Sequence, residues 1–209
     1  MLSTQHQKIH VSTLTEKLED FKAISTDTTS NDFCNRMYRS KNKKIICTWC
    51  YSQNSLTGFR KNSVPALQRN SALLSEPLTE LPFINSAFFR FDAHGELINT
   101  NNLINYLRIA EVNPHCNFAL WTKRIDLVNE VFGDLEAVKP LNFILVYSNP
   151  IIDNVVSEVP NRYFDKIFNN VESTEATGDF MPCTGQKCKD CLNCYKHDGL
   201  TVIVEHVKK

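Results

Sequence analysis

The clearest strand in this 209-residue sequence is Leu141-Asn-Phe-Ile-Leu-Val-Tyr147. Pro140 precedes this apolar run and Ser148-Asn149-Pro150 follows it, so residues typical of turns bound it at both ends. The run therefore predicts a strand, and the rest of the chain can be placed relative to it.

Strands and helices alternate on both sides of this stretch. Further strands are predicted at 83–91, 118–121 and 200–204, while 162–171 fits either a strand or a short helix. Helices are predicted at 12–23, 64–74, 101–112 and 125–132, with Thr100 or Asn101 as the N-cap of the third. This alternation implies βα units and an α/β fold with a mainly parallel sheet, either a partial barrel or an open sheet.

Polar residues follow three of the predicted strands, where parallel α/β sheets usually bind their ligands. They are Asp92, His94 and Glu96 after the first strand, Thr122 and Lys123 after the second, and Ser148 and Asn149 after the third. We take Glu96, Lys123 and His94 as candidate catalytic residues. His94 and Glu96 fit an acid/base pair or a turn, and Lys123 fits an anion site or a solvated strand end.

Four cysteines lie within twelve residues near the end of the sequence, in the run Cys183-Thr-Gly-Gln-Lys-Cys188-Lys-Asp-Cys191-Leu-Asn-Cys194. Their spacing contains a C-x4-C-x2-C run, as in plant-type ferredoxins, and a C-x2-C-x2-C run of the bacterial kind. This density predicts the ligands of a [4Fe–4S] cluster. Zinc is the alternative, because thiolates also bind it.

Three more cysteines, Cys34, Cys47 and Cys50, precede most of the predicted sheet. Cys47 and Cys50 form a C-x2-C pair, a spacing that redox dithiols also use. Three thiolates could bind three irons of a cubane and leave the fourth iron open. Alternatively, some of them could complete the site formed by the cysteines near the end of the sequence. We therefore expect one [4Fe–4S] cluster and leave a second one open, with Trp49 and Tyr51 shielding a cluster from water.

Charge and composition bear on the partners and the compartment. Lys and Arg number 23, as do Asp and Glu, and this zero net charge argues against a nucleic-acid or anionic-lipid partner. The one basic cluster, Arg36-Met-Tyr-Arg-Ser-Lys-Asn-Lys-Lys44, is interpreted as a solvated loop, with contact to an anion or a nucleic acid as the alternative.

No signal peptide is visible, and no apolar run approaches the roughly 20 residues of a membrane span. Eight cysteines without such a signal are expected to stay reduced, which favours metal ligation over disulfides. We therefore expect a cytoplasmic protein with no membrane partner. The length favours a single domain at 31–209, preceded by a polar extension at 1–30.

Several motifs follow one another over residues 34–206: Cys47-x2-Cys50-Tyr51, Ala66-Leu67-x2-Asn70, Arg90, Gly95-Glu96, Ile109-Ala110-x2-Asn113-Pro114, Trp121-Thr122-Lys123, Ser148 and the late cysteine run. In this order they resemble the bacteriophage "gene product 88" family, which tends to have Gly-Asp where this chain has Gly95-Glu96. The resemblance implies a viral protein acting in the host cytoplasm, with two cysteine-rich halves that look like iron–sulfur ligands.

A more remote similarity is to radical S-adenosylmethionine enzymes. Those also place a cysteine loop early, an acidic Gly-Glu loop after the next strand, and a partial βα barrel behind them. Their C-x3-C-x2-C signature differs from Cys34-x12-Cys47-x2-Cys50 in this chain. The similarity is one of architecture, so S-adenosylmethionine enters only as a secondary cofactor candidate.

Two functions follow as hypotheses. The first is an iron–sulfur protein with redox or radical-type chemistry or electron transfer, acting on a small molecule or a redox partner. The second is an interaction module that binds a host or viral protein without catalysis, in which zinc or a cluster staples the fold.

Overall fold

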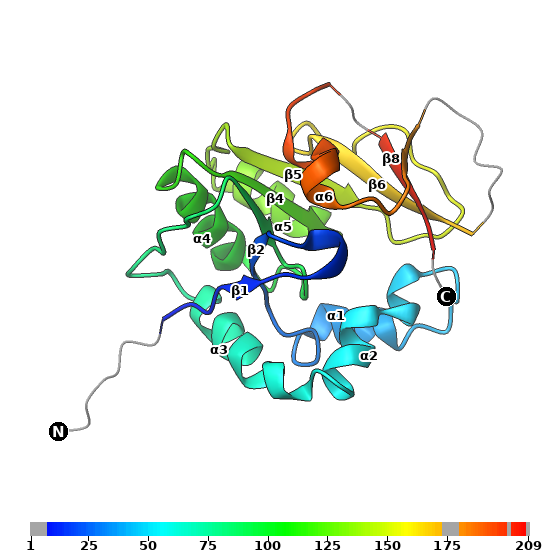
Figure 1. Cartoon of the computed structure of the whole chain (residues 1–209), viewed down its shortest axis with the longest axis horizontal. Helices are drawn as coiled ribbons and strands as arrows, with labels where there is room; N and C mark the ends of the chain where they lie inside the picture. The colour runs from blue at the N-terminus through cyan, green and yellow to red at the C-terminus, as the bar shows by residue number, and fades with distance from the viewer. Residues whose placement is uncertain (1–7, 173–179, 200–201, 208–209) are drawn as a thin grey trace.

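The computed structural model describes residues 8–172, 180–199 and 202–207 (Figure 1). The strands are β1 (Ser12–Thr13), β2 (Lys22–Ile24), β3 (Phe88–Phe91), β4 (Asn117–Thr122), β5 (Phe143–Ser148), β6 (Lys166–Val171), β7 (Met181–Cys183) and β8 (Val202–His206). The α-helices are α1 (Asp32–Tyr38), α2 (Tyr51–Thr57), α3 (Val64–Leu74), α4 (Thr100–Glu111), α5 (Ile125–Asn129) and α6 (Cys188–Cys191). Short 3-10 helices are η1 (Glu16–Leu18), η2 (Ile46–Trp49), η3 (Lys61–Ser63) and η5 (Asn193–Tyr195), and η4 (Glu130–Asp134) is a turn of π-helix.

The described strands form one sheet in the order β1-β2-β3-β4-β5-β6-β8-β7. β1 is antiparallel to β2, and all the other neighbouring pairs are parallel. The predicted α/β fold with a mainly parallel sheet is thus confirmed. From β2 to β6 the neighbours follow chain order. Because crossovers between parallel strands are right-handed, their helices gather on one face of the sheet and leave the other face to a different segment.

The face under the crossover helices carries the larger core. Phe89, Phe91, Phe118 and Phe143 are fully buried there, together with α4 side chains such as Tyr106. The ring centroids of Phe91 and Tyr106 lie 4.0 Å apart, stacked at 18°. Each of these strand residues is two positions from the next core residue on its strand, as the alternation of a pleated strand requires.

The opposite face is covered by the two ends of the described chain. Phe21 and Tyr195 pack there on Ala119, Ile144 and Val146. The α6 helix, orange in Figure 1, lies over the strands, and side chains of the late cysteine run contact this second core. Cys188 and Cys194 therefore lie on this face of the sheet, while Cys183 is in the edge strand β7.

The helix expected at 12–23 is wrong. This segment instead forms β1, η1 and β2, with positive φ angles at Glu16 and Asp20 that break any helical path. Leu14 and Leu18 do share a side, as their spacing indicated, but they contact the second core from a loop and a 3-10 helix. The segment taken as a polar extension thus supplies two strands to the sheet.

The other elements match the sequence predictions more closely. The α3 helix spans the predicted 64–74, and the ambiguous 162–171 segment contains strand β6. Helix 125–132 is shorter as an α-helix, because it passes into the π-helical η4. The predicted strand 200–204 appears as β8, with 200–201 outside the described residues.

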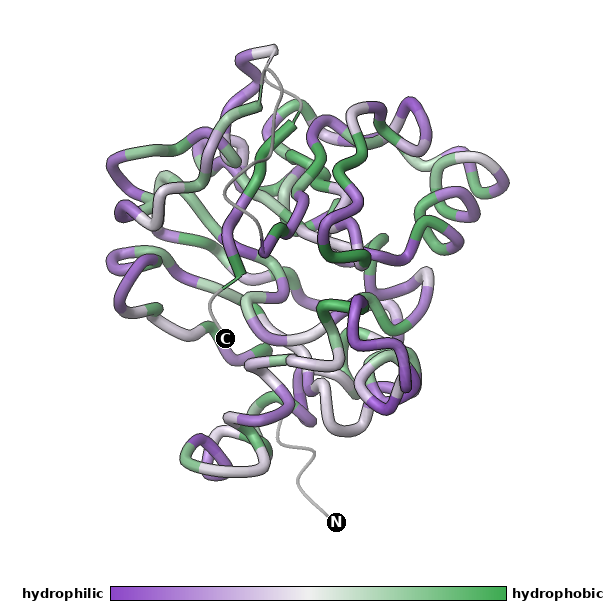
Figure 2. The backbone as a smooth tube through the Cα atoms, turned by 90° about the vertical axis from the view of Figure 1, so that its right-hand side faces the viewer, coloured by the Kyte–Doolittle hydropathy of each residue, from purple (hydrophilic) through white to green (hydrophobic). Residues whose placement is uncertain are grey.

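A long excursion between β2 and β3 carries α1, η2, α2, η3 and α3, the blue-to-cyan helices along one side of Figure 1. Neither α1 nor η2 contains a buried residue. Backbone hydrogen bonds from Ile46 to Pro150 and from Ile152 to Lys44 attach the excursion to the chain after β5. Figure 2 shows hydrophilic residues recurring in such peripheral turns, with hydrophobic stretches inside.

None of the described helices has the length and apolarity needed to cross a bilayer.

Candidate functional site

The carboxyl ends of β3, β4 and β5 meet through one connected set of polar side chains. The Glu96 carboxylate accepts hydrogen bonds from the Thr122 hydroxyl at 2.5 Å and from the backbone N–H groups of Lys123 and Leu97 at 2.9 Å. Lys123 donates from Nζ to the Ser148 hydroxyl at 3.0 Å. The three predicted polar clusters therefore come together at this edge of the sheet.

Gly95 is required for Glu96 to reach this position. Its φ is +117°, a conformation that side-chain-bearing residues rarely adopt. A Cβ there would lie 2.0 Å from the Thr26 hydroxyl and 2.6 Å from an Asp92 carboxylate oxygen. A glycine is thus needed before Glu96 because the loop after β3 lies very close to the segment after β2.

Lys123 is a half-buried cation near thiol groups. Burial disfavours its charged form, but Cys47, Glu96, Cys50 and Cys34 act in the opposite direction, and the net pKa lies above its ordinary value. Among the described residues, its ammonium group has a hydroxyl partner but no carboxylate within ion-pair distance. A half-buried cation of this kind favours an anion nearby.

The early cysteines converge on this lysine from three elements. Cys34 lies in α1, Cys47 in η2, and Cys50 is the N-cap of α2, where its sulfur accepts from the Gln53 N–H at 3.5 Å. Burial raises the pKa of Cys34 and of Cys47, Glu96 adds to the rise, and Lys123 opposes it. Three thiols predicted from spacing are therefore gathered beside Glu96 and Lys123, and we call them the early thiol set.

His94 is held by Arg60 and Ser52. Its Nε2 lies 3.1 Å from the Arg60 guanidinium, and its Nδ1 lies 3.0 Å from the Ser52 hydroxyl. A guanidinium can only donate, so Nε2 accepts and Nδ1 carries the proton. Burial, followed by the charges of Arg60 and Arg90, lowers the pKa of His94 to about 4, so the ring is neutral near pH 7.

Trp49 and Tyr51 have exposed fractions of 44% and 57%. They therefore present their rings to solvent instead of burying them over the thiols.

The late cysteines lie on short elements of the chain. Cys183 is in β7, Cys188 and Cys191 are in α6, and Cys194 is in η5. Burial raises the pKa of Cys194 to about 12, with Cys183, Cys188 and Cys191 adding to the rise. These four, the late thiol set, are thus close enough to influence one another electrostatically.

Two cations face the late thiol set. Arg90 of β3 stacks its guanidinium 3.4 Å from the centre of the Trp121 ring, and its charge opposes the raised pKa values of Cys188 and Cys194. Its Nε is buried without a hydrogen-bond partner among the described residues. Lys17 of η1 donates to Cys183 Sγ at 2.9 Å and to Glu205 at 2.6 Å.

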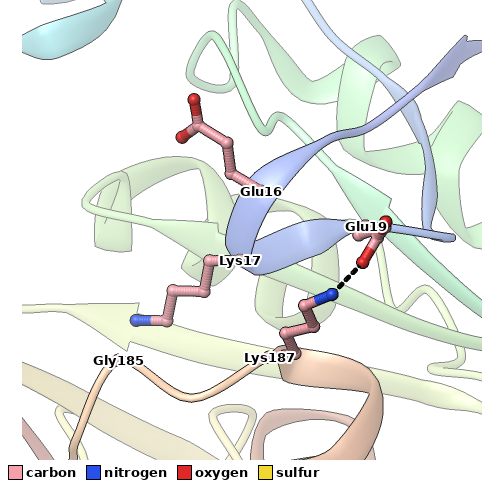
Figure 3. A pocket seen from close by; sticks show the side chains of 5 residues that line it. All are labelled: Glu16, Lys17, Glu19, Gly185 and Lys187. Atoms are coloured by element: carbon pink, nitrogen blue, oxygen red, sulfur yellow. Dashed lines mark hydrogen bonds and ion pairs between the residues drawn. The ribbon is translucent and has the colours of Figure 1, made fainter.

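A hollow of about 460 Å³ borders this set, between η1 and the loop from Cys183 to Cys188. Figure 3 shows Lys17 extending toward Gly185, while Lys187 pairs with Glu19 across the hollow and Glu16 points away. Another hollow, of about 360 Å³, lies between α3 and the loop after β2, and Asp27 and Gln68 are among its lining residues.

The two thiol sets have different surroundings. Glu96 and Lys123 act on the early set, whereas Arg90 and Lys17 act on the late set. The early set lies near the carboxyl edge of the sheet, and Cys188 and Cys194 of the late set contact the second core, so the two thiol sets lie in different parts of the fold.

All eight cysteines are free, including Cys116, which is fully buried as expected. Within the described ranges, no three side chains of His, Cys, Asp or Glu are arranged to hold a metal ion.

Sequence reasoning assigned no role at the late site to Lys17 or Arg90. Lys17 is separated from Cys183 by 166 positions, so no local pattern connects them. The sequence did contain a sign for Arg90. In β3 it lies between Phe89 and Phe91, which are buried on one face, so the alternation of a strand places Arg90 on the other face.

Comparison of the chain with protein-family models, with curated proteins and with solved structures finds no match.

Proposed function

We propose that this chain is an iron–sulfur protein whose early thiol set, Cys34, Cys47 and Cys50, holds a [4Fe–4S] cluster at the carboxyl edge of the sheet. The observation that carries the proposal is that these three thiols lie near enough to the half-buried Lys123 for each to raise its pKa. Three thiolates and their irons form an anionic group, which would add to the negative charge that Glu96 already supplies near the ammonium.

The donor atoms are of the type that such a cluster uses, but the described side chains are not arranged to hold a metal ion, so binding would require the three thiols to move closer together. Sulfur ligands are those that iron–sulfur centres use, and three of them leave one iron open to a further ligand. When bound, such a cluster supplies one-electron chemistry. Around it, Lys123 would bind an anionic group of a small-molecule substrate, and Glu96 would fix the loops that carry Lys123. Redox or radical-type chemistry fits this arrangement, with S-adenosylmethionine as one candidate co-substrate.

We further propose that the late thiol set holds a second metal centre. Its four thiols match a site in which every iron, or a single zinc, has a cysteine ligand. The unpartnered Arg90 Nε supports an anionic occupant there, because a buried guanidinium N–H favours an acceptor such as a thiolate.

A second candidate function is a stapled interaction module without catalysis. It is favoured by the way the late segment is attached, with Lys187 and Lys189 pairing with Glu19 and Asp20 and Lys166 pairing with Asp198. A metal centre there would then hold the late segment to the sheet. In either function, the order of motifs supports a phage protein of the host cytoplasm.

The test is anaerobic purification followed by iron and sulfide quantification and by absorption near 400 nm. The parent chain should carry about eight irons if both sets hold a cubane. Cys50→Ala and Cys188→Ala should each remove about half of that iron, from different centres. Cys116→Ala is the matched control, since this thiol is buried away from both sets.

A colourless protein with stoichiometric zinc would overturn the cluster proposal. Iron that is unchanged in Cys50→Ala would overturn the assignment of the early thiol set. Iron held by the late set alone, with no loss in the Cys50 variant, would favour the stapled module.

A further inference from the structure

The excursion between β2 and β3 contains a basic stretch although the chain is neutral overall. Over its whole length the excursion has eight Lys and Arg against four acidic residues, Asp27, Asp32, Glu76 and Glu80. Residues 33–75 contain eight Lys and Arg and no Asp or Glu. The cations are Arg36, Arg39, Lys41, Lys43, Lys44, Arg60, Lys61 and Arg69. The same excursion carries the early thiol set, so the thiol edge of the sheet is surrounded by positive charge.

Most of these cations are available for a partner. Arg36, Arg39, Lys41, Lys43 and Lys61 are exposed. Within the described part of the chain, Lys44 is the cation of this segment that has an ion-pair partner, Asp153. Positive charge that is not neutralised by the protein's own carboxylates favours binding of a polyanion.

Exposed aromatic rings interleave with the cations. Tyr51 and Phe59 have exposed fractions of 57% and 75%, and their ring centroids lie 6.4 Å apart. The Arg60 guanidinium lies 5.9 Å from the Tyr51 centroid and 5.7 Å from that of Phe59. Neutral His94 stacks on Tyr51 at 6.1 Å and accepts from Arg60, which holds this group in place.

Asp32 at the start of α1 is exposed and offsets part of this charge, whereas the carboxylates of the neighbouring loops are engaged elsewhere. Glu96 is buried and hydrogen-bonded to Thr122 and the chain after it, and Asp126 is held by Arg124 through several N–H groups. Arg124 itself lies 5.1 Å from the Phe33 ring of α1. Hydrogen bonds from Tyr38 to Asn54 and from Gln53 to Asn35 join α1 to α2. The surface formed by α1, the loop to η2, α2 and the loop after α2 thus carries both exposed cations and exposed rings.

We infer that this surface binds single-stranded nucleic acid. Exposed rings provide platforms on which unpaired bases stack, and the cations around them contact phosphates, which is the combination that sequence-tolerant single-strand binding uses. A zero net charge argues against a nucleic-acid partner only when the charge is evenly spread. The inference goes beyond the proposed function and does not depend on a metal centre.

The test is fluorescence anisotropy of a labelled oligo(dT) of about 16 nucleotides, titrated with the full chain over a salt series. Tyr51→Ala and Phe59→Ala should each raise the Kd about fivefold or more, the loss expected for one stacked base. The double variant Arg39→Glu/Lys41→Glu should reduce the slope of log K against log salt by about 1.4, or about 0.7 for each phosphate contact.

Matched controls exist on other parts of the chain. Phe83 has an exposed fraction of 76% and packs on His115 at 5.2 Å, so Phe83→Ala removes an equally exposed ring. Arg162→Glu/Lys196→Glu makes the same charge change at exposed sites outside the excursion. These variants should bind oligo(dT) like the parent chain, and circular dichroism verifies that all the variants are folded.

Three results would overturn the inference. The first is the absence of oligo(dT) binding at about 50 mM salt. The second is an equal loss of oligo(dT) affinity in the Phe59 and Phe83 variants. The third is binding of duplex DNA or heparin that is as tight as the binding of oligo(dT) and is unchanged in the Tyr51 and Phe59 variants. The last result would leave a general polyanion surface in place of a single-strand site.

Discussion

Asp92 is a buried carboxyl group near Thr26 and the Tyr106 hydroxyl, which both lower its pKa against the larger effect of burial. Its Oδ1 accepts from the Thr26 backbone and hydroxyl at 3.0 and 2.8 Å, and Oδ2 is buried. Burial raises the pKa of this carboxyl to about 7, and the charge of Glu96 adds to the rise. The folded state therefore favours the protonated form.

We predict the sign of the resulting pH dependence. Because the folded pKa lies above the unfolded value of about 3.9, the protonated group stabilises the fold below about pH 4. That contribution is lost as the pH rises through about 7, at up to about 1.4 kcal/mol per pH unit. Asp92→Asn removes the titration and tolerates the φ of +49°, so the variant should gain stability over the parent chain across this range.

Urea unfolding at several pH values measures the difference between the two chains. Asp126→Asn is the control, since this exposed carboxyl pairs with Arg124, which lowers its pKa. A constant difference between Asp92→Asn and the parent from pH 4 to 8 would contradict the raised pKa.

Individual site residues were predictable from sequence where they follow a strand directly. Glu96, Lys123 and Ser148 fall in this class, because the carboxyl ends of parallel strands share an edge. Their joint geometry depends on Gly95, whose φ of +117° the sequence only hints at. Lys17 and Arg90 join the late thiol set through tertiary packing, which no spacing rule encodes.

At the scale of single elements, the start of α4 shows what local rules capture. The sequence predicted Thr100 or Asn101 as the N-cap, and the structure has Asn99. Asn99 Oδ1 accepts from the Asn102 N–H at 3.0 Å, and its Nδ2 donates to the Ser75 carbonyl at 2.9 Å. Asn99, Thr100 and Asn101 are all acceptable N-caps by residue type. Asn99 is the cap in the structure because its side chain also reaches Ser75, the C-cap residue of α3.

We expect Asn99→Ala to lower the free energy of unfolding by about 1 kcal/mol or somewhat more, since both hydrogen bonds are lost. Thr100→Ala is the matched control, because it alters the first helical residue and leaves the cap in place. Chemical denaturation with circular dichroism measures both. Equal effects of the two substitutions would refute the assignment of the cap.

The helix wrongly expected at 12–23 illustrates the limit of periodicity. Leu14, Leu18 and Phe21 satisfied a helical pattern because they must face one side. A strand–turn–strand segment can also place these three side chains on one side. The turns of that segment need positive φ angles, which Glu16 and Asp20 adopt. Pairing of β2 with β3, more than sixty residues later in the chain, decided the outcome.

For the whole molecule, strand alternation was sufficient to predict the parallel sheet, because each βα unit repeats the same local pattern. The layers around the sheet were not predictable. The late segment packs on the face that the crossover helices leave open, and this follows from the handedness of the connections between strands.

The same layering predicts an uneven distribution of stability. Neither α1 nor η2 has a buried residue, whereas five of the six residues of β5 are buried. Hydrogen exchange followed by mass spectrometry should therefore show fast amide exchange in the basic excursion and slow exchange in β4 and β5. Protection in α1 and η2 equal to that in β5 would contradict this.

If the early thiol set binds a cluster, iron-loaded protein should exchange more slowly in α1 and η2 and be unchanged in β5. Cys50→Ala protein should show no such difference.

The charge of the excursion has a consequence for the molecule in solution. Because residues 33–75 carry eight positive charges, the rest of the chain carries eight more acids than bases. The neutral molecule therefore has an uneven distribution of charge, with a positive region on the excursion that carries the early thiol set. In the field of any polyanion it would rotate before contact and arrive with the excursion foremost, so long-range attraction would also set the orientation of the encounter.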